Sequence, residues 1–457
     1  MTSVDDALTN TPGGGAEGRR AAALAHIARA ESAAAEGMGL ESVPPLKVAA
    51  AAVIGAGAMG AGIATCFATA GAPVTLVDVA AENVDRGLAA ARANIDGAAA
   101  RGKLTADEAA GARARLSGAT DYAQIAGSDV IIEAVFEDLA LKRTIFSALD
   151  RAAKPSAILA TNTSYLDIDA IAAATARPDK VLGLHFFNPA NIMKLLEIVR
   201  GAATSAQTLA TGVEIARRLQ KTGVVAKVGF GFIGNRMLNA YRTQALNLAL
   251  EGARVAAIDA AVAAFGMPMG PFALMDLTGL DVNVKMRAEA DPARIDARAF
   301  RIVDRIYALG RTGRKSGAGF YLYEAGSRTP APDPVIDAMI AEEARRAGVA
   351  RRSDLHSEEI ADRCILSLVN EGARILEEGV ARCSGDIDVV YVNGYGFPRA
   401  LGGPMYWAEQ EGLAAVAARM EAYRAATGDG RSAPAALLAS AAAAGKPFDA
   451  ALAARQG

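Results

Sequence analysis

The chain has 457 residues, of which 52% are hydrophobic, and a formal net charge of −2 at pH 7. At roughly 150 residues per domain, this length predicts about three domains. The near-zero charge argues against general nucleic-acid binding, which needs a basic face. The three cysteines, Cys66, Cys364 and Cys383, are too far apart for a metal-type pair or a disulfide framework, so we expect no metal and a reducing cytoplasm.

Residues 1–46 are expected to form an arm and a linker helix. Residues 1–18 carry Thr-Pro-Gly-Gly-Gly among scattered polar groups, which is typical of disorder, and their acidic residues disfavour a transit peptide. A short amphipathic helix is expected over 19–36, with Leu24 and Ile27 on one face. His26 lies in this helix, and we expect it to have a surface or packing role.

A glycine-rich turn lies in an uncharged stretch over residues 48–77. The stretch is long enough to span a bilayer, but its glycines divide it into a strand, a helix and a second strand that ends at Asp78. In the turn, Gly55 allows a tight bend, Gly57 lets a pyrophosphate approach the backbone, and Gly60 permits close packing. An acid in the position of Asp78 favours NAD over NADP. The alternative is a packing turn without a ligand.

Further strands are expected over residues 128–137, which run into a helix near Asp138, and over 157–160, 181–184 and 224–228, alternating with helices. This pattern predicts a Rossmann-like, doubly wound parallel sheet with helices on both faces. Glu137, Ser164 and His185 lie at or just beyond the ends of strands, so we expect them at the carboxyl edge beside the glycine turn. An imidazole there can exchange a proton with an alcohol, and Glu197, 12 residues beyond His185, could return to orient it. A core histidine with a satisfied hydrogen bond is the alternative.

After residue 228 the chain is predicted to be helical. A segment from Asn235 to Pro271 is echoed by one from Asp362 to Pro404, which indicates a duplicated all-α domain. We therefore expect an NAD-binding domain over 47–228 and helical domains over 229–325 and 335–457. The first copy has Asn235 where the second copy has Asp362. We therefore expect the first copy to contribute to the site.

Together these motifs resemble the 3-hydroxyacyl-CoA dehydrogenase family, and most closely the dehydrogenase half of peroxisomal-type bifunctional enzymes. The likeness covers residues 48 to 457. It is carried by Val53–Gly60, Glu133–Glu137, Thr161–Ser164, His185–Pro189, Gly231–Arg236 and Gly270-Pro271, in the order and spacing of the family. Tyr165 and Phe230 depart from the pattern, because the family usually has smaller residues there. No hydratase half is expected in residues 1–47.

The resemblance implies NAD-dependent oxidation of (S)-3-hydroxyacyl-CoA in fatty-acid β-oxidation. His185 would be the base and Glu197 its orienting group, while Ser164 and Asn235 would hydrogen-bond the reacting oxygens. The implied cofactor residues are Gly55, Gly57, Ala58, Met59, Gly60, Asp78, Ala134, Glu137, Lys142, Ser164 and Lys315. Arg101 and Lys103 could contact coenzyme A phosphates, although a solvated helix end explains them equally well.

Two other functions stay open: a dehydrogenase of another hydroxy acid, and a non-catalytic NAD-binding protein. Binding of coenzyme A would separate the first from the expected activity. The intact set of His185, Glu197, Ser164 and Asn235 argues against the second. We expect no membrane or nucleic-acid partner, a monomer or homodimer, and a separate hydratase or thiolase as a candidate partner.

Overall fold

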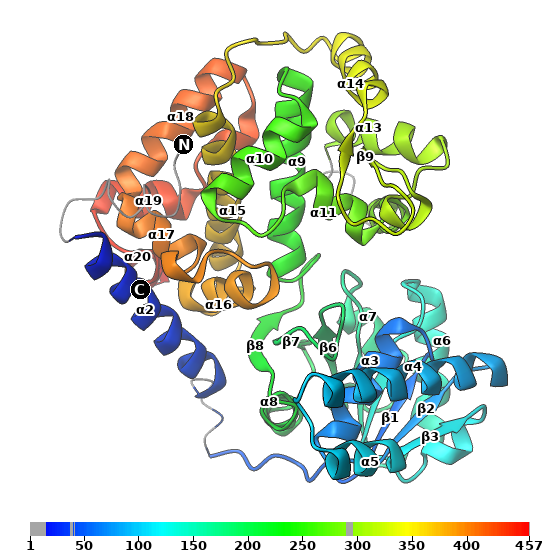
Figure 1. Cartoon of the computed structure of the whole chain (residues 1–457). Helices are drawn as coiled ribbons and strands as arrows, with labels where there is room; N and C mark the ends of the chain where they lie inside the picture. The colour runs from blue at the N-terminus through cyan, green and yellow to red at the C-terminus, as the bar shows by residue number, and fades with distance from the viewer. Residues whose placement is uncertain (1–14, 37–39, 41, 289–295, 457) are drawn as a thin grey trace. The chain divides into compact units, whose positions relative to one another are not determined.

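The computed structural model describes residues 15–36, 40, 42–288 and 296–456. The chain divides into two compact units (Figure 1). The sheet unit contains residues 29–232 and 380–382. The helical unit contains residues 233–379 and 383–457, together with the N-terminal helix as far as Ala28.

The sheet unit is built on eight strands in the order β3-β2-β1-β4-β5-β6-β7-β8. Neighbouring strands are parallel except for the β6–β7 pair, which is antiparallel. The chain winds outward from β1 in one direction and then from β4 in the other, so the β1–β4 boundary is the switch point of a doubly wound sheet. The strands are β1 (Ala51–Ile54), β2 (Val74–Val77), β3 (Leu116–Ala119), β4 (Val130–Glu133), β5 (Ile158–Thr161), β6 (Val181–Phe186), β7 (Leu195–Arg200) and β8 (Thr222–Lys227).

Helices cover both faces of this sheet. One continuous apolar core joins one face to α3 (Ala58–Thr69), α4 (Ala81–Ala100), α5 (Ala106–Ala114) and α8 (Ala206–Arg218). The crossover helices α6 (Leu139–Ala152) and α7 (Ile168–Ala172) pack on each other and stand outside that core. Every residue of β1, β4 and β5 is buried, as expected for parallel strands covered on both sides.

Several expectations need correction. The uncharged stretch over 48–77 does fold as strand, helix and strand, but its first strand begins only at Ala51. The sheet is not wholly parallel, because β7 returns beside β6 as a hairpin. Strand β3, with the sequence Leu-Ser-Gly-Ala, was not expected, since it lacks the β-branched residues that mark strands.

The N-terminal arm is also only partly as expected. The disorder expected over 1–18 lies outside the described residues up to 14, but 16–18 belong to helix α2 (Ala16–Glu36). Leu24 does not share the buried face of this helix, because it is 38% exposed while Ala23 and Ile27 are buried. His26 has the packing role expected of it: its ring stacks on Tyr406, and Nε2 lies 2.9 Å from Asp388 Oδ2.

The helical unit contains α9 to α20 and a short hairpin. Its first part holds α9 (Gly234–Glu251), α10 (Val255–Phe265), α11 (Pro271–Thr278), α12 (Leu280–Ala288), α13 (Ala297–Ala308), β9 (Tyr321–Leu322) and β10 (Ala331–Pro332). Its second part holds α14 (Pro334–Arg346), α15 (Ser357–Glu377), α16 (Ser384–Gly394), α17 (Pro404–Glu411), α18 (Leu413–Thr427), α19 (Ala436–Ala444) and α20 (Phe448–Gln456). No helix among the described residues is both long enough and apolar enough to cross a membrane.

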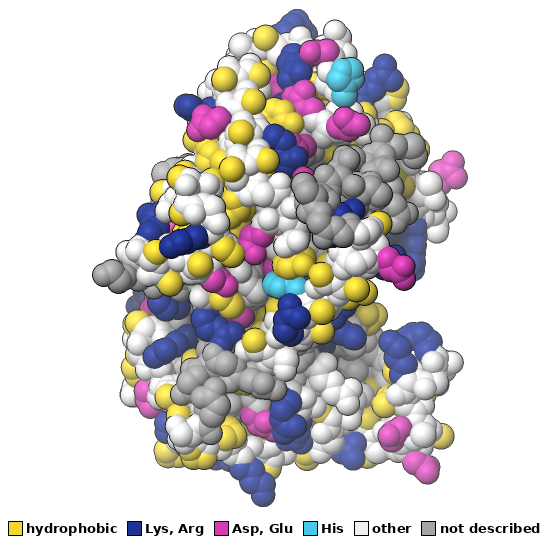
Figure 2. Space-filling model, turned by 90° about the vertical axis from the view of Figure 1, so that its left-hand side faces the viewer, with side chains coloured by type: hydrophobic (Ala, Val, Ile, Leu, Met, Phe, Trp, Pro, Cys, Tyr) yellow, Lys and Arg dark blue, Asp and Glu magenta, His cyan; other side chains and the backbone are white. Residues whose placement is uncertain are grey.

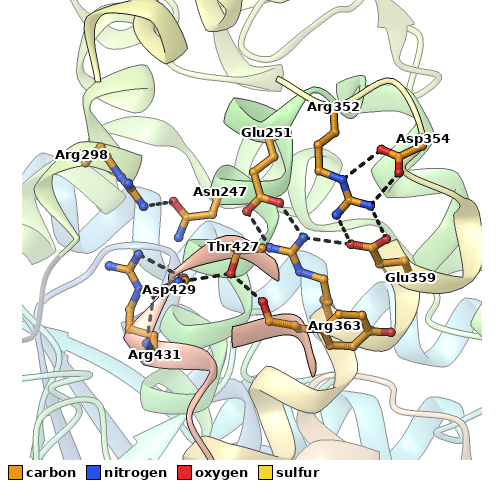
Figure 3. A network of polar contacts seen from close by, with 11 residues as sticks. Asn247, Glu251, Arg298, Arg352, Asp354, Glu359, Arg363, Thr427, Asp429 and Arg431 are labelled. Carbon is orange, nitrogen blue, oxygen red and sulfur yellow. Dashed lines mark hydrogen bonds and ion pairs between the residues drawn. The ribbon is translucent and has the colours of Figure 1, made fainter. Parts of the chain in front are cut away.

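The two repeats hold each other through corresponding ion pairs. Arg236 on α9 forms a bidentate ion pair with Glu378, in which Nη1 and Nη2 donate to the two carboxylate oxygens at 2.6 and 2.7 Å. The equivalent arginine of the second repeat, Arg363 on α15, contacts Glu251 at 2.6 Å through both nitrogens (Figure 3). Each repeat therefore supplies an arginine near the start of its long helix and a glutamate at or just beyond the end.

Candidate active site

His185 and Glu197 face each other across the β6–β7 hairpin. They are register partners in the antiparallel pair, and both side chains are buried. His185 Nδ1 lies 2.7 Å from Glu197 Oε2. If Nδ1 carries the proton that Glu197 accepts, Nε2 has a free lone pair and can take a proton from a substrate. The return of Glu197 toward the imidazole, expected from a spacing of 12 residues, is thus present.

The Thr161–Ser164 segment leaves β5 beside the strand that carries His185. Phe186 N–H donates to Asn162 Oδ1 at 2.8 Å, which ties this segment to the residue after the histidine. The backbone N–H of Ser164 donates to Glu137 at 2.7 Å. Within the described residues the Ser164 hydroxyl itself makes no hydrogen bond, so it remains available to a ligand.

The glycine turn at the switch point has the geometry that a dinucleotide requires. Gly55 has φ +102°, and a Cβ there would lie 2.7 Å from the carbonyl oxygen of Ala134. A Cβ on Gly60 would lie 1.8 Å from the carbonyl oxygen of Gly55. Gly57, in contrast, has open space around its missing side chain. It caps α3 without a side-chain hydrogen bond, so the N–H groups of the first turn, which includes Ala58 and Met59, can receive a phosphate.

Asp78 follows β2 and supports the turn. Its Oδ2 accepts from Ala56 N–H at 2.9 Å, and its Oδ1 accepts from Asn83 Nδ2 at 2.8 Å. Burial alone would raise the pKa of Asp78, but these hydrogen bonds together lower the pKa below its usual value. The carboxylate is therefore ionised at neutral pH, as recognition of ribose hydroxyls requires.

Lys142 and Glu137 lie next to the Ser164 turn. Lys142 Nζ is 2.6 Å from Glu133 and 3.4 Å from Glu137, and its side chain is only 1% exposed. Glu133 is fully buried at the end of β4 and also accepts from Thr161 Oγ1 at 2.7 Å. Glu133, Asn162 and Asn83 were not among the predicted site residues. Glu133 and Asn162 lie within the family motifs Glu133–Glu137 and Thr161–Ser164, and this position could have identified them.

The four remaining predicted residues lie on other elements than the β6–β7 hairpin. Arg101 and Lys103 are exposed just beyond the end of α4. Asn235 and Lys315 belong to the helical unit. Asn235 lies in the first turn of α9 and accepts from the Tyr395 hydroxyl at 3.0 Å, while Lys315 is paired with Asp281 at 2.6 Å.

On the face drawn in Figure 2, basic and acidic side chains are interspersed with hydrophobic ones. This mixture agrees with the formal net charge of −2.

Two family models match most of the chain. The 3-hydroxyacyl-CoA dehydrogenase NAD binding domain matches residues 50–229. The C-terminal domain of the same family matches twice, over 231–323 and 360–451, which confirms the duplication expected from the sequence. The cofactor of this family's sheet domain is NAD, in agreement with the position of Asp78.

Similar proteins agree with these matches. The peroxisomal bifunctional enzyme of Homo sapiens is 39% identical over 384 residues, which is 81% of this chain and 53% of that protein. The chain thus spans about half the length of the curated relatives it matches.

Two solved structures are also similar. The structure of 3-hydroxybutyryl-CoA dehydrogenase from Escherichia coli K12 has a TM-score of 0.76 and 30% identity, and the match covers 87% of this chain and 99% of that one. The dehydrogenase part of multifunctional enzyme 1 from C. elegans has a TM-score of 0.64 and 29% identity, covering 96% and 99%. The chain belongs to the 3-hydroxyacyl-CoA dehydrogenase family.

Proposed function

We propose that this protein catalyses the NAD-dependent oxidation of (S)-3-hydroxyacyl-CoA to 3-ketoacyl-CoA in fatty-acid β-oxidation or related acyl-CoA metabolism. The observation that carries the proposal is the buried His185–Glu197 pair, at 2.7 Å, on the same sheet edge as the glycine turn. A site that transfers a proton and a hydride needs both an acid–base pair and a place for the dinucleotide.

In the proposed mechanism, His185 Nε2 takes the proton of the 3-hydroxyl group. Glu197 stabilises the imidazolium that forms and keeps the ring in one orientation. The Ser164 hydroxyl donates a hydrogen bond to the reacting oxygen, and Asn235 provides a second donor. When bound, NAD supplies the acceptor for the hydride that leaves C3.

We further propose how the remaining residues serve the cofactor and substrate. Asp78 would accept from the ribose hydroxyls, and the turn from Gly55 to Gly60 would hold the pyrophosphate. The nicotinamide side would be lined by Ala134, Glu137, Lys142, Ser164 and Lys315. Arg101 and Lys103 are proposed contacts for coenzyme A phosphates.

The wider setting is also a proposal. The wide spacing of the three cysteines in the sequence supports a reducing compartment, and we propose the cytoplasm. We propose that the domains span residues 47–228, 229–325 and 335–457, and that the protein is a monomer or a homodimer. Because several relatives are named as multifunctional or bifunctional enzymes, a separate hydratase or thiolase is the proposed partner.

The direct test is oxidation of NADH with acetoacetyl-CoA, with a longer 3-ketoacyl-CoA, and with free acetoacetate. We expect turnover with the coenzyme A esters and little with the free acid, since the E. coli relative is described as acting on 3-hydroxybutyryl-CoA. Turnover of the free acid alone would favour a dehydrogenase of another hydroxy acid. NADH binding without any turnover would favour a non-catalytic NAD-binding protein.

A further inference from the structure

One oxygen of Glu137 collects three donors from the turn that carries Ser164. Oε1 accepts from Thr163 Oγ1 at 2.5 Å, from Ser164 N–H at 2.7 Å and from Tyr165 N–H at 3.1 Å. Glu137 precedes α6, whereas the turn follows β5, so these bonds join segments that are distant in sequence. The carboxylate thereby fixes the backbone on both sides of Ser164.

Lys142 in turn fixes the other oxygen of Glu137. Its Nζ lies 3.4 Å from Glu137 Oε2 and 2.6 Å from Glu133 Oε1. Glu133 is fully buried, and it also holds the first residue of the same segment through the bond from Thr161 Oγ1. The buried ammonium of Lys142 thus links two carboxylates. Glu133 accepts a hydrogen bond from the beginning of the segment 161–165, and Glu137 accepts hydrogen bonds from its end.

Within this segment the Ser164 hydroxyl has no hydrogen bond in the part of the chain that is described, and the residue is half-buried. A hydroxyl that is held by its backbone but left without a partner can point to a ligand without first breaking a bond. Preorganised donors of this kind lose little free energy to reorganisation during a reaction.

We propose that Glu137 is a positioning residue that presents the Ser164 hydroxyl to the reacting oxygen, with Lys142 and Glu133 fixing its orientation. This inference rests on the proposed function, because it assigns a role within the same reaction. It replaces the cofactor-lining roles proposed above for Glu137 and Lys142. Since Lys142 is almost fully buried between two carboxylates, its main contribution is to hold Glu133 and Glu137 in place rather than to bind NAD.

The test is a double-mutant cycle on turnover with acetoacetyl-CoA. Ser164→Ala alone is expected to lower kcat by about a hundredfold, the usual loss for a stabilising donor. Glu137→Ala should lower kcat by about tenfold in the wild-type background, but by less than about threefold when Ser164 is already alanine. The dissociation constant of NADH, measured by fluorescence, should stay within about threefold.

Control variants separate positioning from general damage. Glu137→Gln keeps an oxygen that can accept from the turn, so it should retain more activity than Glu137→Ala. Glu214→Ala removes a carboxylate on α8 that pairs with the exposed Arg217, and it should behave as wild type. Equal losses of kcat for Glu137→Ala in both backgrounds would overturn the inference, as would a loss confined to NADH affinity.

A second measurement does not depend on turnover. Hydrogen exchange of residues 161–166 should be faster in Glu137→Ala than in wild type, while residues 181–185 of the histidine strand should exchange at an unchanged rate. Unchanged exchange over 161–166 would overturn the inference. If wild type lacks turnover but the exchange result holds, the proposed reaction fails while the positioning of Ser164 stands.

Discussion

At the scale of single residues, the central feature is a buried imidazole with one carboxylate partner. His185 and Glu197 are 3% and 0% exposed, so their contact is shielded from bulk water. A charged carboxylate at Nδ1 favours the imidazolium that forms when Nε2 takes a proton. The pair is therefore suited to reversible proton exchange with an alcohol.

Glu197→Gln tests this pairing. The amide can still meet Nδ1, but it cannot offset a positive charge on the ring, so we expect kcat to fall by about tenfold to a hundredfold. A steady-state assay with acetoacetyl-CoA measures kcat, and an unchanged kcat would remove Glu197 from the proposed role.

The sequence was sufficient to predict this pair but not the network behind Ser164. Histidine is rare in the chain, and a turn between two apolar runs brings a residue 12 positions later back beside it. The contacts of Glu133 and Asn162 depend on how three strands lie next to one another. The periodicity of the sequence does not reveal contacts between strands. Glu133 and Asn162 could therefore be recognised as parts of motifs, but no role could be predicted for them.

At the scale of elements, the glycine turn and its helix form the proposed cofactor site. Gly55 and Gly60 are required by the fold itself, since a Cβ at either position would meet backbone within 2.7 Å. Gly57 has no such neighbour, so its lack of a side chain has no explanation within the described protein atoms. A bound pyrophosphate would supply that explanation.

Gly57→Ala separates the two roles. The melting temperature should stay within about 2 °C of wild type, because the new methyl group contacts nothing within 4 Å. Affinity for NADH should fall by about tenfold or more, since the methyl group occupies the path of the pyrophosphate. Thermal unfolding and fluorescence titration measure these quantities, and unaltered NADH affinity would contradict the proposed place of the phosphates.

Elements also show where sequence patterns fail. Strand β6 was expected to end at His185 but continues to Phe186, and β7 pairs with it in the antiparallel sense. A short apolar run does not reveal the direction of its partner. The sheet could therefore be predicted as doubly wound, while the hairpin that creates the site was only inferred from a spacing.

At the scale of the whole chain, duplication explains the helical unit. In the first repeat, Asp259 accepts from the N–H groups of Phe272 and Ala273 at the start of α11. In the second, Asp388 accepts from the N–H groups of Met405 and Tyr406 at the start of α17. The third partners differ. Asp259 accepts from the Tyr321 hydroxyl, whereas Asp388 meets His26 of the N-terminal helix.

The reciprocal ion pairs predict unequal costs of removal. Glu251, the partner of Arg363, is 11% exposed. Arg236 has two partners: Glu378, which is 46% exposed, and Glu371, which is 14% exposed but also pairs with Arg374 at 2.9 Å. Arg363→Met should lower the free energy of unfolding by about 3 kcal/mol or more, because it leaves a buried carboxylate unpaired. Arg236→Met is the matched control and should cost less, because Glu371 keeps Arg374 and Glu378 is exposed to water. Urea denaturation measures both, and equal costs would contradict the importance of burial.

A buried carboxyl in the second repeat predicts a pH dependence of stability. Burial raises the pKa of Glu409 from 4.5 to about 7. A pKa raised by folding contributes stability that is complete below about 4.5 and is lost as the pH rises through about 7. Glu409→Gln removes this titration and keeps an acceptor for Phe448 N–H, which donates to Glu409 at 2.9 Å.

Wild type should therefore lose stability relative to Glu409→Gln between pH 5 and pH 8, by at most about 3 kcal/mol. Urea denaturation at the two pH values measures the difference. Parallel behaviour of the two proteins would show that Glu409 does not titrate in this range.

The most direct test of the whole account is turnover of acetoacetyl-CoA by His185→Gln, with NADH affinity measured on the same preparation. We predict that kcat falls by at least about a hundredfold while the dissociation constant of NADH stays within about threefold of wild type. Glutamine cannot accept and return the proton, but the cofactor cradle does not involve this side chain. Unchanged turnover in the variant would contradict the assignment of His185 as the base.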